Sequence, residues 1–437
     1  MSRVIARLRQ RLQLLWLADQ IPDGVIRQNA HNSLADGAFF AAAQGLTNPF
    51  LGPFVIALGG SDVHVGLVTA APALGGLVGQ LPAVWLTERS PARMPVVLAY
   101  TLAHRLFFLF FAALPFLEGM PRAWLLVIGL GLAMVPATVT NTAWTTLMGD
   151  LFPGRLRAQI FADRNVWVAL ATLAGSAMAG PLLDALPPRW NWWALFLLAF
   201  GCLMGSYVFL ARLREGAPAG PVRDAAAGRA RAGPRGYADI LRNREFLSFL
   251  VPVAVFYGGM MLAAPMYPII YVRKLHLANS WIASFSLLSG ICSVATYRYW
   301  GRACVRWGSR YVFALAAAAH VTFPMGYALA GSPYVLLFWS AVGGIFGAAF
   351  NLALFNLLLD VSAGEGRPRY VGAYNLAING TTLLFPMLGV AAYMAWGLYV
   401  AMGISTAGRL LGTALLARGA RPARTAIPGR GAGVPLA

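Results

Sequence analysis

Long apolar runs separated by short polar connections make up most of this sequence. A hydrocarbon core about 30 Å thick is crossed by roughly 20 apolar helical residues, whose backbone hydrogen bonds stay within the segment. Twelve runs meet that length, near residues 33–58, 63–86, 95–117, 123–148, 161–186, 191–211, 247–271, 281–299, 310–330, 334–359, 369–395 and 397–417. The pattern therefore predicts an all-α membrane protein with twelve transmembrane helices in two six-helix bundles.

The polar segments around these runs set the predicted domain boundaries. Apolar and arginine residues in 1–31 fall at helical spacing, which predicts an amphipathic cytoplasmic segment on an anionic leaflet, with a disordered basic arm as the alternative. Residues 32–213 and 246–418 form the two bundles. The Ala, Gly, Pro and Arg-rich residues 214–245 predict a flexible cytoplasmic linker, and 419–437 a disordered cytoplasmic tail.

Composition supports a membrane protein. Hydrophobic residues make up 59% of the chain, charged residues only 11%, and the mean hydropathy is +0.64. That leaves too little polar surface to cover a water-soluble globule. The cysteines are scattered without metal-ligand or redox spacing, so we predict that they pack as small apolar residues: Cys202, Cys292 and Cys304. We expect no cofactor and no metal.

The net charge of +19 would suggest nucleic-acid binding in a soluble protein, but the distribution of the charge argues against it. Of the 34 Lys and Arg residues, 27 fall on one predicted side of the membrane, and only Arg122, Arg189, Arg273 and Lys274 on the other. The positive-inside bias then places both termini in the cytoplasm. We expect a multi-pass protein of the cell (inner) membrane, monomeric, whose partners are membrane lipids and a small-molecule substrate, with no nucleic acid.

The two halves repeat one another around a charged segment. In each half a paired-proline exit from the first span precedes a span rich in small residues and then a charged segment that opens the third span. Pro53 to Arg89 is 36 residues, and Pro268 to Arg306 is 38. Within the second span, Gly75 and Gly79 have the spacing that allows two helices to approach closely.

These charged segments give the chain a resemblance to the major facilitator superfamily, whose signature Gly-x-x-x-Asp-Arg-x-Gly-Arg-Arg/Lys follows spans 2 and 8. The first copy falls on Val84, Glu88, Arg89, Pro91, Ala92 and Arg93, and has lost both glycines. The second falls on Gly301, Val305, Arg306, Gly308, Ser309 and Arg310, and has lost the acid.

Two further motifs extend the resemblance over residues 32–417. "DLFPGRLRAQIFADRN" is similar to the family's loop between spans 4 and 5, and "SAMAGP" partly matches its span-5 antiporter motif. Leu183 and Asp184 stand where the antiporter form has two glycines. Membership would imply six plus six spans and alternating access around a central cavity.

Charges at the cytoplasmic mouth can pair only while the bundles are closed on that side, so their pairing would bias the access equilibrium. We therefore predict a cytoplasmic gate, with topology anchors as the alternative role, at Glu88, Arg89, Arg93, Arg306, Arg310, Asp150 and Asp360.

The resemblance implies that spans 1, 4, 7 and 10 line the cavity. Asp36 is the only acid well inside a span, and intramembrane ionisable groups are functional candidates. We predict proton coupling through Asp36 and His104, although loop pairing of Asp36 and interhelical hydrogen bonding by His104, Arg105, His320 and Arg409 stay open. The predicted substrate cavity comprises Asp36, Phe40, Gln44, Asn48, Asn141, Trp144, Tyr257, Tyr267, Phe350 and Asn356.

The leading functional hypothesis is a secondary transporter that exports a small amphipathic or aromatic solute by alternating access, with proton coupling as one option. An uncoupled facilitator, an importer or a lipid flippase of the same fold is an alternative, as is a non-transporting scaffold or sensor. An enzyme is not expected, because the spans offer one acid and distant histidines rather than a catalytic cluster.

Overall fold

The structure is a computed structural model that describes residues 23–90, 92–152, 154–214, 243–362 and 367–417. Every regular element in these segments is a helix. The predicted tail (419–437) lies wholly outside the described residues, and most of the predicted amphipathic segment (1–31) and of the predicted linker (214–245) also lies outside them.

Residues 24–211 form the N-terminal bundle. Its first span is kinked, because Pro49 and Pro53 interrupt the helix, and consists of α2 (Gly24–Thr47), η2 (Asn48–Phe50) and α3 (Leu51–Ala57). The other five spans are α4 (Asp62–Arg89), α5 (Met94–Ala113) with η3 (Leu114–Phe116), α6 (Arg122–Leu151), α7 (Gly154–Ala185) and α8 (Trp190–Ala211).

Residues 244–417 form the C-terminal bundle. Its first span is again interrupted at prolines, and consists of α11 (Arg244–Ala263), α12 (Met266–Ile269) and the π turn η4 (Ile270–Lys274). The next spans are α13 (Asn279–Trp307), α14 (Ser309–Val321) with α15 (Phe323–Ala328), and α16 (Pro333–Val361). The continuous α17 (Arg367–Ala417) is two helices joined at Gly397, whose φ of 83° lies in the left-handed region.

These elements confirm the prediction of an all-α membrane protein with twelve spans. Ten of the described helices are long and apolar enough to cross a membrane, and one of them covers both halves of α17. The segment from α2 to α3 is the remaining span. Its polar first turns lower its mean hydropathy, and the kink at Asn48–Phe50 divides it.

Most helices extend beyond the predicted spans by a few residues at one end. The largest extension is in α2, which begins at Gly24 because the Asp23 carboxylate caps the backbone amides of Val25 and Ile26. Its polar first turns are then used for packing. The side chain of Asn29 exchanges two hydrogen bonds with the backbone of Arg214, just after α8 ends.

Close glycine contacts join neighbouring helices, and they confirm the approach expected at Gly75 and Gly79. A Cβ placed on Gly75 would lie 1.9 Å from the carbonyl oxygen of Gly131 in α6, and one on Gly79 would lie 3.0 Å from the Cα of Val135. Gly76, the next residue, would place its Cβ 3.7 Å from the Thr138 hydroxyl, an ordinary contact.

Gly75→Ala is therefore expected to separate α4 from α6 and to destabilise the bundle by about 1–3 kcal/mol, as overpacking does. Thermal unfolding in detergent measures the loss. Gly76→Ala is the matched control, and we expect it to unfold like the wild type. Equal unfolding temperatures for the two variants would contradict the contact.

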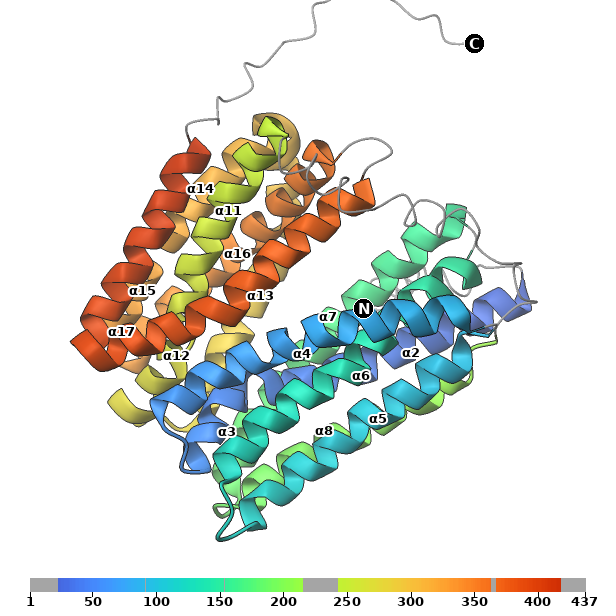
Figure 1. The fold of residues 1–437 in the computed structure, drawn as a ribbon, viewed down its shortest axis with the longest axis horizontal. Helices are drawn as coiled ribbons and strands as arrows, with labels where there is room; N and C mark the ends of the chain where they lie inside the picture. Colours follow the sequence, from blue (N-terminus) through green and yellow to red (C-terminus); the bar gives the residue numbers. More distant parts are fainter. Residues whose placement is uncertain (1–22, 91, 153, 215–242, 363–366, 418–437) are drawn as a thin grey trace, which may run out of the picture.

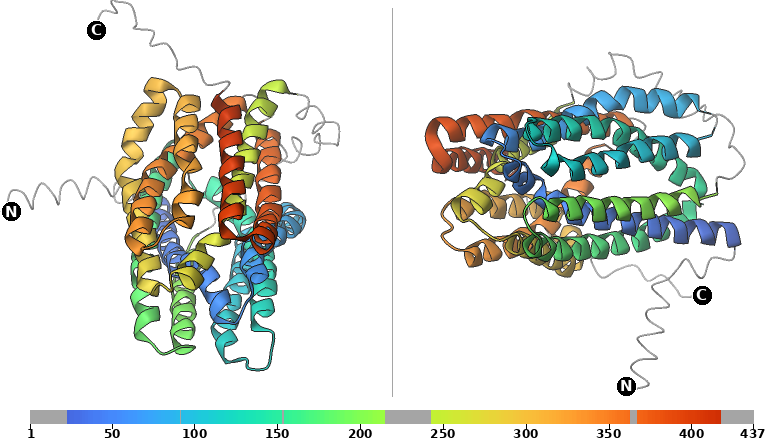
Figure 2. Two further views of the ribbon diagram at one scale, coloured as in Figure 1. Left: turned by 90° about the vertical axis from the view of Figure 1, so that its left-hand side faces the viewer. Right: turned by 90° about the horizontal axis from the view of Figure 1, so that it is seen from below.

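The two bundles are joined at one end and diverge at the other (Figure 1). They meet where α3 lies against α12, and α4 against α17 and α7 against α13 extend the contact. In Figure 2 the blue-to-green helices lie mainly below the yellow-to-red helices in the left view and mainly to their right in the right view, and the two groups overlap where the bundles meet. We call these the joined end, near residues 58–62 and 273–280, and the divergent end, where α2, α7 and α11 begin.

The hydrophobic core follows the same division. One buried cluster near the joined end contains residues of both bundles, among them Phe50, Leu183, Met266 and Ala283. The two other clusters each stay within one bundle. One draws its buried residues only from 246–416, and the other only from 30–213.

Candidate functional site

An ion pair links the bundles at the joined end. Arg273 on η4 pairs with Asp62, the first residue of α4, and its second amino group donates to the Gly60 carbonyl at 2.7 Å. The guanidinium is thus held by one charged and one backbone acceptor from the opposite bundle. Both side chains are partly exposed, so this pair is a modest contact by itself.

A second link is a helix cap supplied from the other bundle. Helix α13 has no side-chain cap of its own at Ala278. The Asp184 carboxylate, from the end of α7, instead accepts the backbone N–H groups of Asn279 at 2.9 Å and Ser280 at 2.8 Å. It also accepts the Asn279 side-chain amide at 2.9 Å and the Ser280 hydroxyl at 2.5 Å. The acid thus satisfies the free amides of a helix N-terminus across the interface between the bundles.

The paired prolines of the sequence repeat meet between these links. A Cβ placed on Gly52 in α3 would lie 2.3 Å from the Pro268 ring, so only a glycine permits this approach. Beside it is a pocket of ≈ 300 Å³ that both bundles line, with Asn48, Pro49, Leu51, Gly52, Val65, Val68, Thr69, Ala264, Pro265 and Pro268.

Three of the predicted cavity residues lie on one stripe of the first span, two of them on α2 and Asn48 at the start of η2. Phe40, Gln44 and Asn48 follow one another at a spacing of four, which places them on one helix face. Asn48 lines the pocket between the bundles, while Phe40 is 40% exposed and Gln44 is half-buried. The opposite face of α2 packs on α7, where Gly45 approaches the Thr172 carbonyl. The stripe therefore leads from the pocket toward the divergent end.

Asp36 lies inside the N-terminal bundle and is only 5% exposed. Its carboxylate accepts the Ser206 hydroxyl at 2.6 Å and lies 3.8 Å from the Arg164 guanidinium. Arg105 donates to the same Ser206 hydroxyl at 2.8 Å. Asp36 thus contacts Arg164 directly and Arg105 through the Ser206 hydroxyl, and these four side chains link α2, α5, α7 and α8. Asp36 lines neither of the two cavities described here.

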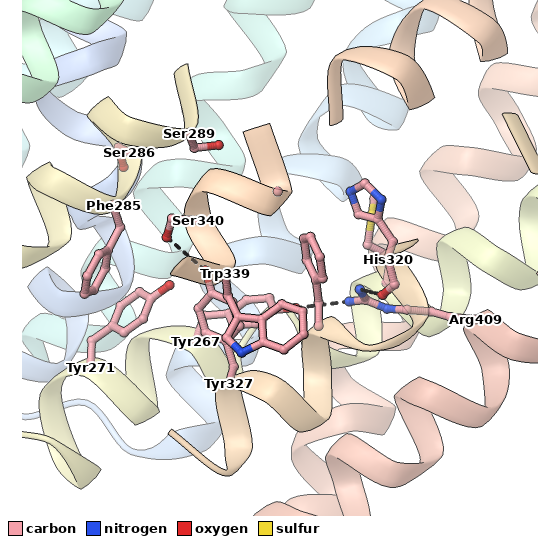
Figure 3. A pocket seen from close by; sticks show the side chains of 13 residues that line it. Tyr267, Tyr271, Phe285, Ser286, Ser289, His320, Tyr327, Trp339, Ser340 and Arg409 are labelled. Carbon is pink, nitrogen blue, oxygen red and sulfur yellow. Dashed lines mark hydrogen bonds between the residues drawn. The ribbon is translucent and has the colours of Figure 1, made fainter. Parts of the chain in front are cut away.

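A second cavity, of ≈ 340 Å³, lies within the C-terminal bundle (Figure 3). Its wall is mainly aromatic and hydroxyl-bearing, and one cation, Arg409, reaches toward Tyr267, Tyr327 and Trp339. Of the predicted cavity residues, Tyr267 lines it. The lining comes from α11, α12, η4, α13, α14, α15, α16 and α17, and so from one bundle alone.

The remaining predicted cavity residues occupy other places. Phe350 is 4% exposed and packs on Phe256 and His320 in the core of the C-terminal bundle, with Tyr257 beside it. Asn356 is half-buried on α16.

In the N-terminal bundle, Asn141 is exposed on α6. Trp144 stacks on the Arg164 guanidinium at 4.7 Å, next to Asp36. His104, predicted to couple protons, packs edge-to-face on Phe108 with ring centroids 5.6 Å apart. The predicted site residues are thus divided among three regions rather than gathered in one cavity.

The predicted cytoplasmic gate lies at the divergent end. Arg89 stacks on Trp85 at 4.6 Å, Arg306 and Asp360 are exposed, and Arg310 is half-buried. Arg93 is half-buried and has a partner. The side chains of the two acids, Glu88 and Asp150, lie outside the described part. The polar links between the bundles described above are at the opposite end.

The joined-end residues were missed by reasoning from the sequence, although a signal was present. The four basic residues that break the positive-inside bias all have partners in the structure. Arg273 and Lys274 are adjacent, and Lys274 donates to the Ala328 and Ala330 carbonyls at 2.5 and 3.2 Å. Arg122 donates to the Pro115 carbonyl at 3.2 Å, and Arg189 pairs with Glu118. The signal was the presence of basic residues on the side that the sequence predicts to be poor in them.

Within the described segments, no group of three or more His, Cys, Asp or Glu side chains is arranged to hold a metal ion. The described residues therefore offer polar links between the bundles, a pocket between the bundles and a cavity within one bundle.

Comparison with known proteins relates this geometry to transporters. The family model of the Major Facilitator Superfamily matches residues 37–298. No curated protein matches the sequence.

Several solved structures share the fold at low sequence identity. The nucleoside transporter NupG is 14% identical with a TM-score of 0.66, covering 90% of this chain and 99% of its own. A bacterial homolog of the human lysosomal transporter Spinster, inward-facing and unoccupied, is 12% identical with a TM-score of 0.63, covering 91% and 95%. A D-xylose-proton symporter is 12% identical with a TM-score of 0.63, covering 90% and 96%.

Proposed function

Because the chain belongs to the Major Facilitator Superfamily, we propose that it is a secondary transporter that exports a small amphipathic or aromatic solute by alternating access. The two bundles rock about the pocket between Asn48 and Pro268, and the joined and divergent ends open in turn.

The observation that carries this proposal is the division of the hydrophobic core. A single cluster spans both bundles near the joined end, whereas the other two clusters each stay within one bundle. Two bundles that keep their own cores can move as rigid bodies. The joined end then depends on a limited set of contacts, including Asp62 with Arg273 and Asp184 with α13.

The charge distribution supports the direction in which the divergent end opens. The connections at that end, together with the two chain ends, hold 27 of the 34 basic residues, and such connections face the cytoplasm. The described conformation is then inward-facing and accepts solute from the cytoplasm. Gly180 of "SAMAGP" packs closely on α13 at the joined end, where its Cβ would lie 2.7 Å from Ala283 and Ser280.

The substrate class rests on the lining of the cleft. Phe40, Gln44 and Asn48 place an aromatic ring and two amides on one stripe, and the pocket at its end is apolar apart from Asn48 and Thr69. Such a surface suits a solute with an apolar body and few polar groups. Proton coupling stays part of the proposal and is measured as flux with and without a pH gradient.

The proposal is tested by locking the joined end. Asp62→Cys with Arg273→Cys, in a background without Cys202, Cys292 and Cys304, is joined by a short reducible cross-linker. In proteoliposomes we expect flux of rhodamine 6G, ethidium or carboxyfluorescein to stop on cross-linking and to return with reductant.

The matched control joins two positions at the same end but within one bundle, Glu118→Cys and Arg189→Cys, whose native side chains form an ion pair. Its flux is expected to survive cross-linking. Flux that continues through the protein locked between Asp62 and Arg273 would contradict alternating access. Inside-out and right-side-out vesicles give the direction, and import would overturn the export assignment.

A further inference from the structure

Arg409 is a buried cation with no counter-charge among the residues that the structure describes. It is 1% exposed and lies on the last span, where Nη1 donates to the His320 carbonyl at 2.9 Å and Nη2 to the Tyr267 hydroxyl at 3.1 Å. Its Nε is buried and has no hydrogen-bond partner among the described residues. No carboxylate of those residues forms an ion pair with it. Burying an unpaired guanidinium inside a transmembrane bundle costs free energy, and a bound anion would offset that cost by balancing the charge.

The cavity wall next to Arg409 supplies further hydrogen-bonding groups. The hydroxyls of Tyr271, Ser286 and Ser289 belong to lining residues, and the Tyr327 hydroxyl lies 3.2 Å from that of Ser340. Figure 3 shows Arg409 and Tyr271 reaching inward from different helices. These groups can orient a ligand, but none of them carries the negative charge that would balance Arg409.

The rest of the wall is aromatic. Phe285, Phe323 and Trp339 contribute ring faces and edges, together with the tyrosines. The volume of ≈ 340 Å³ lies at the small end of the range for ligand pockets, so it suits a one-ring compound rather than a large one. Aromatic walls favour an aromatic or apolar body, and the guanidinium favours an anionic head, most strongly a carboxylate that takes two N–H bonds.

We propose that this cavity binds a small organic anion, a monocarboxylate with an aromatic or short apolar body, whose carboxylate pairs with Arg409. The site is separate from the pocket between the bundles, because every lining residue belongs to the C-terminal bundle. A cationic ligand is disfavoured, since the cavity has a cation and no lining acid.

Binding to the full chain in detergent tests the proposal, with calorimetry as the readout. The probes are 3-phenylpropionate, its neutral amide, and 3-phenylpropylamine as the cationic analogue. We expect the anion to bind about tenfold or more tightly than the amide, because a charged hydrogen-bonded pair replaces a neutral one, and the amine not to bind.

Two variants locate the site. Arg409→Gln keeps hydrogen-bond donors but removes the charge, so it is expected to weaken anion binding about tenfold or more and to leave amide binding unchanged. Retained amide binding also shows that the cavity is folded. Ser286→Phe fills the cavity and is expected to abolish binding of both probes. The matched control is Arg105→Gln, a buried arginine outside the cavity, which should bind the anion like the wild type.

Equal affinities for the anion and the amide would overturn the proposal, as would wild-type anion binding by both Arg409→Gln and Ser286→Phe. Loss of anion binding in Arg105→Gln, with its fold retained, would also overturn it, because the effect would then not be local. These outcomes are independent of transport. If the protein fails to bind 3-phenylpropionate but its flux stops on cross-linking between Asp62→Cys and Arg273→Cys, the cavity proposal is wrong and the proposed function stands.

Discussion

Asp184→Ala combined with Asp62→Asn is expected to open the joined end. The double variant removes the cap on α13 and the charge opposite Arg273, while the hydrophobic contacts around them stay. A helix cap and a partly exposed charged contact together contribute about 2 kcal/mol, so the ratio of closed to open joined end should fall about thirtyfold. If opening of the joined end limits the rate of transport, the flux of solute would change together with this ratio.

Distances between spin labels at the joined end measure this shift, with one label at Met120 and the other at Tyr334, both exposed. The control is Glu118→Ala, which removes an acid at the same end whose partner, Arg189, lies in the same bundle. Its distance distribution should match that of the wild type. If the double variant also keeps the wild-type distribution, these polar links do not hold the joined end closed.

Asp36→Asn is expected to destabilise the N-terminal bundle strongly. Asparagine can still accept the Ser206 hydroxyl, but it leaves Arg164 and Arg105 buried without a negative charge. Breaking a buried pair by removing one partner costs about 3–5 kcal/mol. The midpoint of thermal unfolding in detergent should therefore fall by several degrees. Asp360→Asn, which changes an exposed acid on α16, is the control and should unfold like the wild type.

The same variant separates two roles for Asp36. If the carboxylate is structural, restoring neutrality by adding Arg164→Gln should recover much of the lost stability, because fewer unpaired charges remain buried. If Asp36→Asn unfolds like the wild type, the carboxylate contributes no pairing energy. Its role would then be sought in coupling, as flux driven by a pH gradient.

The spans were predictable because the hydrocarbon core of a membrane requires each spanning segment to be a long, apolar helix. Runs of about 20 apolar residues gave twelve helices in the right places, and the repeat of prolines and charged segments gave the two bundles. The start of α2 was placed too late, since Asn29 and Asp23 are polar and hydropathy does not detect helical turns that lie outside an apolar run. Capping and the packing of Asn29 on the end of α8 decide that boundary.

The site was harder to predict than the fold. Helical spacing placed Phe40, Gln44 and Asn48 on one face. The sequence does not show, however, whether a polar side chain points into the core of its own bundle or toward the other bundle. Asp36 lies on the same helix, and its partners Arg164 and Ser206 come from spans far apart in sequence. Likewise, the cap from Asp184 to α13 spans about a hundred residues and two bundles, so no local pattern could reveal it.

Two residues of the five-residue π turn η4 contact different parts of the protein. Tyr271 of this turn lines the cavity within the C-terminal bundle, and Arg273, two residues later, holds Asp62 of the other bundle. A displacement of the turn that releases Arg273 also displaces a wall of the cavity. If the cavity binds an anion and the bundles rock as proposed, occupancy of the cavity and opening of the joined end would share one coupling free energy, so each would alter the other by the same factor.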